Sequence, residues 1–372
     1  MSINSTAFHI DLTQLKRNWQ WLDAKTNRFC RTASVVKANA YGHGIEAVAK
    51  SLFDAGCRIF CVARLEEAIE LRSILVAGNN DDKKSEIICF DGLRDGGLAD
   101  YRAHNLIPAL KQLSEIDDAN RFARETGEAL PVWIQLDTGM NRLGISEAEL
   151  SSISLGIKSV SLIGLDIRAV MSHLSSSDNP SHHTNEQHHA RFKQMSALFG
   201  TLPRSLSASH GIMLANKFHF DITRPGIALY GYSDNPIAEF GCKPILRWTA
   251  PILQVRFIGA GEQVGYGADF TAGAPMRIAT VGAGYADGYE RLLQQSGKIS
   301  VAGYICNIVG RISMDSLVIN VSDIPEKELE NISQVSLIGA HYTAADMASD
   351  VSTISYEILT GLGTRPKRIY DG

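Results

Sequence analysis

The sequence predicts a fold of class α/β plus β: an N-terminal (β/α)8 barrel of the TIM type in residues 1–235, followed by a mostly β-strand domain in residues 236–372. Short apolar runs alternate with longer amphipathic ones from residue 32 to 231, which is typical of repeated βα units around a parallel sheet. Near residue 236, β-branched segments punctuated by glycine replace that alternation. The length of 372 residues, 45% of them hydrophobic, suits one barrel and one smaller domain.

Eight candidate strands occur in the first part. They centre on "ASVVK" (33–37), "RIFCVA" (58–63), "EIICF" (86–90), "NLIPAL" (105–110), "VWIQLD" (132–137), "LIGLDIRAVMSH" (162–173), "RSLSAS" (204–209) and "ITRPGIALYG" (222–231). Between them, segments such as 44–56 and 64–75 repeat apolar residues at three- and four-residue spacing, which predicts helices. Eight units favour a closed barrel; an open doubly wound sheet is the alternative that periodicity leaves open.

The second part has little helical periodicity. Its β-branched segments are "APILQVRFIGAGEQVGYG" (250–267), "MRIATVGAGYADG" (276–288), "ISVAGYICNIVGRISMDSLVINVSD" (299–323) and "QVSLIGA" (334–340). Such segments predict a separate domain built mainly of strands.

Composition narrows the class of partner. A net charge of -4 and a pI near 6.3 provide no basic surface for nucleic acid, which favours a small-molecule partner. We expect a cytoplasmic protein. The first twenty residues contain no apolar core as long as that of a signal peptide, and no later run approaches the ~18 apolar residues of a membrane span. The six cysteines lack CxxC pairs and are expected to fill the core. No metal site is expected, since "HHTNEQHH" (182–189) has no justified ligand spacing.

In a barrel of this kind, reactive residues lie where strands end and loops begin. This rule selects Lys37, the 137–142 loop with Arg142, His173, Ser209, and the Arg224 and Gly226 pair. The loops after strands 7 and 8 often hold a phosphate in such barrels. A lone lysine at a strand end is most often an exposed surface residue. Beside a phosphate site, however, a desolvated amine that forms a Schiff base with pyridoxal 5'-phosphate becomes the stronger hypothesis.

Several motifs resemble those of one family, the alanine racemases, which are fold-type III pyridoxal-phosphate enzymes. These are "SVVKANAYGHG" (34–44), "CVARLEEAIELR" (61–72), "DTGMNRLG" (137–144), "MSHLSSSD" (171–178), "TRPGIALYG" (223–231), "VGYGADF" (264–270), "GYADGY" (284–289), "GRISMD" (310–315) and "ISYE" (354–357). They follow one another in order over nearly the whole chain.

The resemblance implies roles for individual residues. Lys37 would hold the cofactor and act as one catalytic base, and Tyr266 would be the second base, contributed by the other subunit of a homodimer. Around the cofactor, Tyr41, Ser209, Gly226, Ile227 and Tyr356 would contact the phosphate, His173 the ring, Arg224 the pyridine nitrogen and Arg142 the phenolic oxygen. Arg142 would also bind the substrate carboxylate, and Tyr285 and Met314 of the partner would line the substrate entrance.

The implied reaction is the interconversion of L-alanine and D-alanine, which either supplies D-alanine for peptidoglycan or degrades it. A racemase of broader selectivity or for serine is the nearest alternative, because one methylene is worth only ~1–3 kcal/mol of discrimination. An amino-acid decarboxylase and a non-enzymatic cofactor-binding protein fit the motifs less well. One position departs from the family: Gln135 stands where many members carry a carbamylated lysine that orients the arginine corresponding to Arg142. We hypothesise that Gln135 or a bound halide performs that role.

Overall fold

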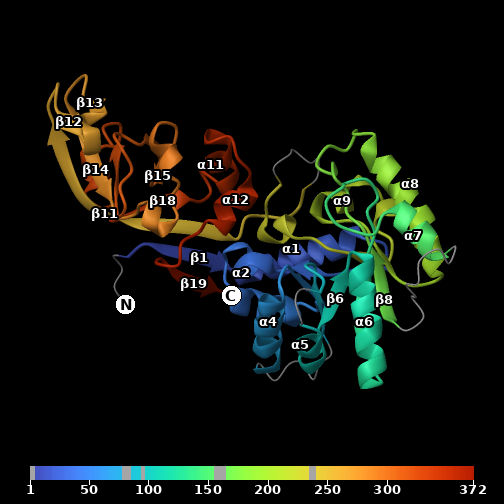
Figure 1. Cartoon of the computed structure of the whole chain (residues 1–372). Helices are drawn as coiled ribbons and strands as arrows, with labels where there is room; N and C mark the ends of the chain where they lie inside the picture. The colour runs from blue at the N-terminus through green and yellow to red at the C-terminus, as the bar shows by residue number, and fades with distance from the viewer. Residues whose placement is uncertain (1–4, 78–84, 94–96, 155–164, 234–239) are drawn as a thin grey trace. The chain divides into compact units, whose positions relative to one another are not determined.

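The computed structural model describes residues 5–77, 85–93, 97–154, 165–233 and 240–372, and the chain forms two compact units. The barrel unit comprises Leu15–Ala40 and Ile45–Lys243, and the β unit comprises Met1–Gln14, Tyr41–Gly44 and Pro244–Gly372. The boundary predicted between residues 235 and 236 falls outside the described residues. Figure 1 labels the elements of both units.

The barrel unit contains a seven-stranded parallel sheet whose strand order follows the sequence. Its strands are β3 (Ser34–Val35), β4 (Ile59–Val62), β5 (Glu86–Cys89), β6 (Ile107–Leu110), β7 (Pro131–Gln135), β8 (Asp166–Met171) and β9 (Arg204–Ser205). All residues of β6 are buried, as expected for a parallel strand covered on both faces.

An eighth strand closes this sheet. Strand β10 (Ile222–Thr223) pairs in parallel with β2 (Arg31–Thr32), which directly precedes β3. On its other side, the Arg224 N–H donates to the Ser207 carbonyl at 2.8 Å, which links β10 to the segment after β9. The predicted barrel is therefore confirmed, and the open doubly wound sheet is wrong because sequential strands pair all the way round.

The last predicted strand, 222–231, is wrong in its second half. Ile227–Tyr230 form the 3-10 helix η3, which ends at Gly231 in the left-handed region (φ 86°). A run of four apolar residues between two glycines is compatible with a buried helical turn as well as with a buried strand, so the sequence pattern does not distinguish the two. For the predicted strand 162–173, β8 covers 166–171, and residues 162–164 lie outside the described chain.

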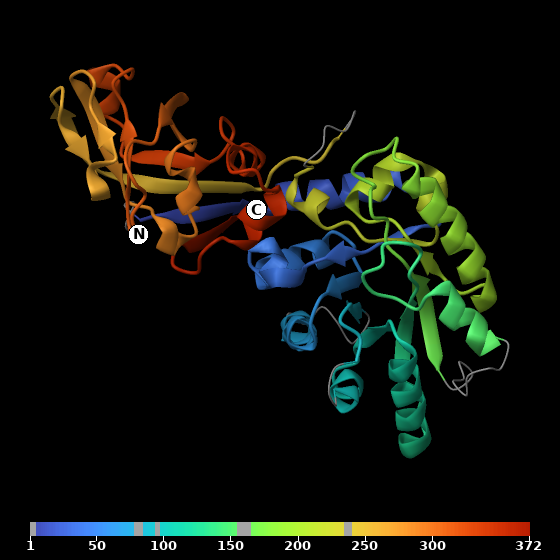
Figure 2. The same cartoon turned by 45° about the horizontal axis from the view of Figure 1, so that its top comes forward.

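The helices of the barrel unit lie around the outside of its strands (Figure 2). They are α1 (Leu12–Lys25), α3 (Ile45–Asp54), α4 (Leu65–Ala77), α5 (Leu98–Ala103), α6 (Leu113–Thr126), α7 (Glu147–Ser154), α8 (Thr184–Ser196) and α9 (Ser209–Leu214), with the 3-10 turns η1 (Ala197–Phe199) and η2 (Asn216–Phe218). The helices predicted over 44–56 and 64–75 are confirmed as α3 and α4.

The β unit is built on an eight-stranded sheet that also includes the first strand of the chain. Strand β1 (Ala7–Asp11) lies between β11 (Leu246–Ile258) and β19 (Lys367–Asp371). The other strands are β14 (Met276–Val281), β15 (Lys298–Val301), β16 (Tyr304–Asn307), β17 (Leu317–Asn320) and β18 (Gln334–Ile338), while β12 (Gln263–Val264) and β13 (Phe270–Thr271) form a separate pair. The 3-10 turns η4 (Tyr266–Ala268), η5 (Tyr285–Asp287) and η6 (Arg291–Gln294) and the helices α10 (Glu326–Leu329), α11 (Ala344–Asp350) and α12 (Ser355–Thr360) connect them.

Each unit has its own core. Trp133 is fully buried in the barrel unit, and Trp248 packs edge-on against Phe8 (5.0 Å between ring centroids) and Tyr289 (5.7 Å) in the β unit. All six cysteines are buried free thiols, as expected. Within the described residues, no helix is both long and apolar enough to cross a membrane.

Candidate active site

The predicted site residues of the barrel unit follow the carboxyl ends of its strands. Lys37 comes after β3, His173 after β8 and Arg224 after β10, and Arg142 lies in the loop after β7. The ends of parallel barrel strands meet on one face. Lys37, Arg142 and Arg224 all act electrostatically on His173, so the structure brings these four groups together.

Lys37 opens the short element α2 (Lys37–Tyr41), whose backbone is left-handed. Ala38, Asn39, Ala40 and Tyr41 all have φ between 52° and 54°. Left-handed helical backbone costs roughly 1–2 kcal/mol per residue for side chains with a Cβ atom. A run of four such residues beside a candidate catalytic lysine points to a functional constraint, since strain of this kind collects at active sites.

Hydrogen bonds within the barrel unit hold this turn. The donor and acceptor pairs are the Ala38 N–H with Glu67 Oε1 (2.6 Å), the Ala40 N–H with the Val36 carbonyl (2.9 Å) and the Ile45 N–H with Asn39 Oδ1 (2.8 Å). The turn is therefore anchored at its beginning, middle and end.

The ammonium of Lys37 is destabilised by its surroundings. Burial is the main cause that lowers the pKa of Lys37, and the Arg142 guanidinium lowers it further, while Glu67 and Asp91 oppose the shift. A lowered pKa leaves more of the lysine as the neutral amine, which is the form that attacks a carbonyl or accepts a proton.

The loop that carries Arg142 is braced from both sides. Asp137 Oδ1 accepts hydrogen bonds from the Gly139 N–H (2.8 Å) and the Asn141 N–H (3.1 Å). Gln135 is buried, and its Nε2 donates to the Leu143 carbonyl at 3.2 Å. Gln135 thus contacts the residue after Arg142, and it does so as a donor.

Arg224 is a buried cation at the end of β10. Its Nη2 donates to the Ser172 carbonyl at 2.6 Å, next to His173, and its Nη1 donates to the Ser205 hydroxyl. Burial lowers the pKa of Arg224 to about 10, so the guanidinium stays charged at neutral pH. Burial, and then the neighbouring Arg224, lower the pKa of His173 to about 3, so this imidazole is neutral.

Ser209, Gly226 and Ile227 are buried, and the Ser209 hydroxyl lies against the backbone amides of the 226–228 segment. Ser209 Oγ accepts hydrogen bonds from the Gly226 N–H (2.9 Å) and the Ala228 N–H (3.2 Å). Amide and hydroxyl donors at the barrel strand ends, two residues along the chain from the cation Arg224, suit an anionic group such as a phosphate. The donor set of the barrel unit therefore fits a phosphorylated cofactor.

The remaining predicted residues belong to the β unit. Tyr41 and Tyr356 lie side by side, with ring centroids 6.0 Å apart. Tyr285 and Met314 lie on adjoining turns, because the Tyr285 N–H donates to the Ser313 carbonyl and the Ala286 N–H to the Met314 carbonyl, each at 3.1 Å.

An ionic network ties these two turns together. Arg365 donates to both carboxylate oxygens of the buried Asp287 at 2.7 Å and to Asp315 at 2.6 Å. Asp287 also accepts from the Gly284 N–H at 2.9 Å. This network holds the backbone on either side of Tyr285 and Met314 in one arrangement.

Tyr266 stands on the turn η4 and is 74% exposed. Gly267, in the left-handed region (φ 75°), lies against Arg311: a Cβ there would come within 2.9 Å of the guanidinium carbon. Arg311 in turn forms a two-point ion pair with Asp269. The turn is thus fixed although its tyrosine is exposed.

The sequence argument missed Glu67, Asp287 and Arg365. Glu67 stands three residues after Arg64, the residue before helix α4 begins, which is the spacing of a helix-capping acid. That spacing predicts the hydrogen bond from the Arg64 N–H to Glu67. It does not predict the hydrogen bond from the Ala38 N–H, which is 29 residues away in the sequence.

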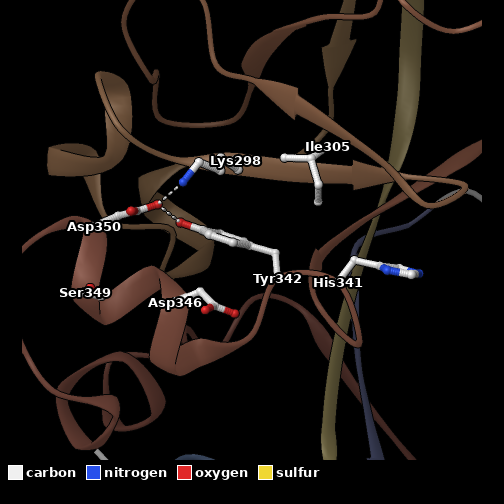
Figure 3. A pocket seen from close by; sticks show the side chains of 7 residues that line it. All are labelled: Lys298, Ile305, His341, Tyr342, Asp346, Ser349 and Asp350. Atoms are coloured by element: carbon white, nitrogen blue, oxygen red, sulfur yellow. Dashed lines mark hydrogen bonds and ion pairs between the residues drawn. The ribbon is translucent and has the colours of Figure 1, made fainter.

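A cavity of about 230 Å³ lies in the β unit (Figure 3). Its polar wall is formed by Asp350, which accepts from the Tyr342 hydroxyl at 2.8 Å and pairs with Lys298 at 3.4 Å. None of the predicted site residues lines it.

Comparison with known proteins covers both units. Family models described as "Alanine racemase, N-terminal domain" and "Alanine racemase, C-terminal domain" match residues 10–234 and 245–370. A catabolic alanine racemase of Agrobacterium fabrum is 42% identical over 361 residues, which is 97% of this chain and 91% of the relative. An alanine racemase of Brucella suis is 37% identical over 375 residues, 97% of this chain and 92% of the relative.

A solved structure extends this similarity to the fold. The alanine racemase from Bartonella henselae with covalently bound pyridoxal phosphate superposes with a TM-score of 0.92, at 35% identity and 99% coverage of both chains. The barrel followed by a β-rich domain is thus the architecture of a known class of enzymes. Within that class, the chain belongs to the alanine racemase family.

Proposed function

We propose that the protein interconverts L-alanine and D-alanine with pyridoxal 5'-phosphate, using Lys37 and Tyr266 as the two proton-carrying bases. One observation carries the proposal: the half-buried Lys37, with its lowered pKa, follows the end of a barrel strand, as do Ser209 and Gly226, which join the ends of two further strands through a hydrogen bond. The names of the relatives and the cofactor in the Bartonella henselae structure support the same reaction.

In this proposal the residues of the barrel unit hold the cofactor. Lys37 would hold it covalently, and Arg224, His173 and Arg142 would contact its pyridine nitrogen, its ring and its phenolic oxygen, respectively. Ser209, Gly226, Ile227, Tyr41 and Tyr356 would be the residues that contact the phosphate. The bound cofactor would supply the electron-withdrawing group that makes the α-proton of the substrate acidic.

Arg224 determines what kind of partner the pyridine nitrogen has. A guanidinium has donors only, and the pKa of about 10 keeps Arg224 charged, so Arg224 would donate a hydrogen bond to the ring nitrogen and leave it unprotonated. A weaker electron sink favours return of the proton to the α-carbon over protonation elsewhere.

Inversion of the α-carbon needs a proton to leave one face and another to arrive on the opposite face. The amine of Lys37 serves one face and the phenol of Tyr266 the other. An unperturbed tyrosine has a pKa of ~10, so it needs stabilisation of its phenolate to act as a base. The neutral imidazole of His173 can supply it by donating to Tyr266 from one nitrogen while it accepts from Arg224 at the other.

The proposal includes a homodimer with shared sites. Residues 236–372 then serve as the domain that contributes Tyr266 to the barrel of residues 1–235 in the partner subunit. Tyr285 and Met314 line the substrate entrance, and Arg142 binds the carboxylate of alanine. We also place the enzyme in the cytoplasm, where its six free, buried cysteines stay reduced.

The test is incubation of the cofactor-loaded protein with L-alanine in heavy water. Proton NMR follows loss of the α-proton, and chiral chromatography follows D-alanine. We expect both signals to appear together and to approach an equal mixture of enantiomers. Bound cofactor without α-proton exchange on alanine, serine or other amino acids would exclude racemase activity.

A further inference from the structure

The carboxylate of Glu67 accepts hydrogen bonds from three backbone N–H groups in two different loops. Its Oε1 accepts from the Ala38 N–H at 2.6 Å, and its Oε2 accepts from the Ala63 N–H at 2.9 Å and the Arg64 N–H at 3.1 Å. Ala38 follows Lys37, whereas Ala63 and Arg64 follow β4. One side chain therefore ties the loop after the first barrel strand to the loop after the second.

The bond to Ala38 acts directly on Lys37. The Ala38 nitrogen belongs to the peptide group that begins at the Lys37 carbonyl, so this hydrogen bond fixes the plane of that peptide. The next residues are left-handed, and a strained backbone persists only where its surroundings hold it. Without the anchor, the first left-handed residue loses its charged partner and the turn can relax.

We propose that Glu67 is a positioning residue for Lys37: its carboxylate holds the peptide that follows the lysine and so fixes where the amine lies on the strand-end face. This inference rests on the proposed role of Lys37 as the cofactor-binding base. Glu67 would then act on Lys37 in two ways, because its charge is also the strongest influence that raises the pKa of that amine.

The charge of Glu67 matters because of the groups around Lys37. Arg142 lowers the pKa of Lys37, as burial does, while Glu67, Asp91 and Cys61 raise it. His173 is also in electrostatic reach but is neutral. Removing the Glu67 charge therefore lowers the pKa of Lys37 further, which shifts the pH at which the amine becomes reactive downward.

The substitution Glu67→Gln separates this role from general packing. A glutamine has nearly the same shape, but one of its two terminal atoms is an amide nitrogen that can only donate. It would face either the Ala38 N–H or the Ala63 and Arg64 amides, so a donor would meet donors. Glu66→Gln is the matched control, because Glu66 lies on the same turn of α4, is exposed and loses the same charge.

Two measurements on cofactor-free protein test the proposal. Hydrogen exchange followed by mass spectrometry reports the peptide that spans 36–45, and absorbance reports the rate of covalent bond formation with added pyridoxal phosphate as a function of pH. For Glu67→Gln we expect faster exchange in that peptide and a plateau rate lower by about tenfold or more, the size of one lost charged hydrogen bond. The pH midpoint should move downward, which a purely structural loss would not produce, and Glu66→Gln should match the wild type.

The outcomes separate this proposal from the one on which it rests. Covalent cofactor on Lys37, identified by borohydride reduction and peptide mapping, with equal kinetics and exchange in Glu67→Gln and wild type, would overturn the role of Glu67 alone. Absence of covalent cofactor on Lys37 in the wild type would overturn both. If Glu67→Gln fails to fold, the wild type still decides: an Ala38 amide that exchanges as fast as an unstructured peptide contradicts the anchor.

Discussion

The predicted active-site residues of the barrel unit and of the β unit differ in the exposure of their side chains. Ser209 and Arg224 are 5% and 2% exposed, and each has hydrogen-bond partners within its own unit. Tyr266, Met314 and Tyr285 are 74%, 52% and 43% exposed, although the turns that carry them are fixed by ion pairs and backbone hydrogen bonds. The barrel-unit residues are buried and hydrogen-bonded within their own unit. The β-unit residues are exposed on turns whose backbone is fixed.

This difference fits a site completed by a second copy of the chain. The barrel unit would supply the cofactor-binding half of each site, and the β unit the second base and the entrance of its partner.

Loss of Lys37 on the barrel side should cause the greatest loss of activity. Lys37→Ala removes both the covalent link to the cofactor and one base, so α-proton exchange and racemisation should fall by ~10³-fold or more. Lys50→Ala is the control, since Lys50 pairs with Glu46 on the surface of α3 and its loss should leave activity unchanged. Both rates are measured on L-alanine in heavy water; activity within tenfold of wild type would remove Lys37 from the mechanism.

Mixing two inactive variants tests most directly whether each active site is shared between two chains. Lys37→Ala and Tyr266→Phe are each expected to be nearly inactive. After unfolding and refolding together in equal amounts, half of the dimers are mixed, and one of their two sites contains both native bases, so about a quarter of wild-type activity should return. If each site were built from one chain, mixing would restore nothing.

On the β-unit side, the network around Arg365 should control the substrate entrance. Arg365→Met removes the two-point contact with the buried Asp287 and the bond to Asp315. We expect the free energy of unfolding to fall, because the buried Asp287 loses its charged partner, and KM for alanine to rise while the covalent cofactor signal is unchanged. Lys367→Met, a nearby exposed residue that loses the same charge, is the control. A KM equal to that of wild type would separate Tyr285 and Met314 from this network.

Burial on the barrel side should also make the protein sensitive to acid. The pKa of His173 is lowered to about 3 in the folded chain, against 6.5 for an unperturbed histidine. Between these values the unfolded chain binds a proton that the folded chain does not, so stability present above pH 6.5 is lost as pH falls toward 3, by up to ~1.4 kcal/mol per pH unit. Chemical denaturation between pH 7 and 4 should show a shallower loss for His173→Gln, with the exposed His183→Gln as control. Parallel curves for His173→Gln and wild type would contradict the lowered pKa of His173.

The barrel half of the site could be predicted because the carboxyl ends of all barrel strands lie on the same face. Lys37, His173 and Arg224 each follow an apolar run that forms a strand, so their convergence required only strand positions and the rule for parallel barrels. The resemblance to the family added Tyr266, Tyr285 and Met314, whose importance no local pattern indicates.

Other features could not be predicted because they depend on contacts distant in sequence. Ala38 and Ala40 have no preference for left-handed backbone, and this conformation exists beside the Glu67 anchor 29 residues away. Likewise, Arg365 meets Asp287 across 78 residues, and neither residue stands in a pattern that distinguishes it from a surface charge. Short apolar runs such as Ile227–Tyr230 leave helix and strand equally possible until their glycines are placed in three dimensions.

The smallest expected effect concerns Gln135. Its amide nitrogen donates to the Leu143 carbonyl, so it can hold the Arg142 loop without a charged group. Gln135→Leu keeps the size but loses the donor, and a single neutral hydrogen bond of ~0.5–1.5 kcal/mol corresponds to a KM for alanine about two- to tenfold higher. The exposed Gln187→Leu is the control. Because glutamine has no amine for carbon dioxide to modify, added bicarbonate should not change the activity of wild type. Stimulation by bicarbonate would show that another residue orients Arg142, and a bound halide can be tested separately by exchanging chloride for acetate.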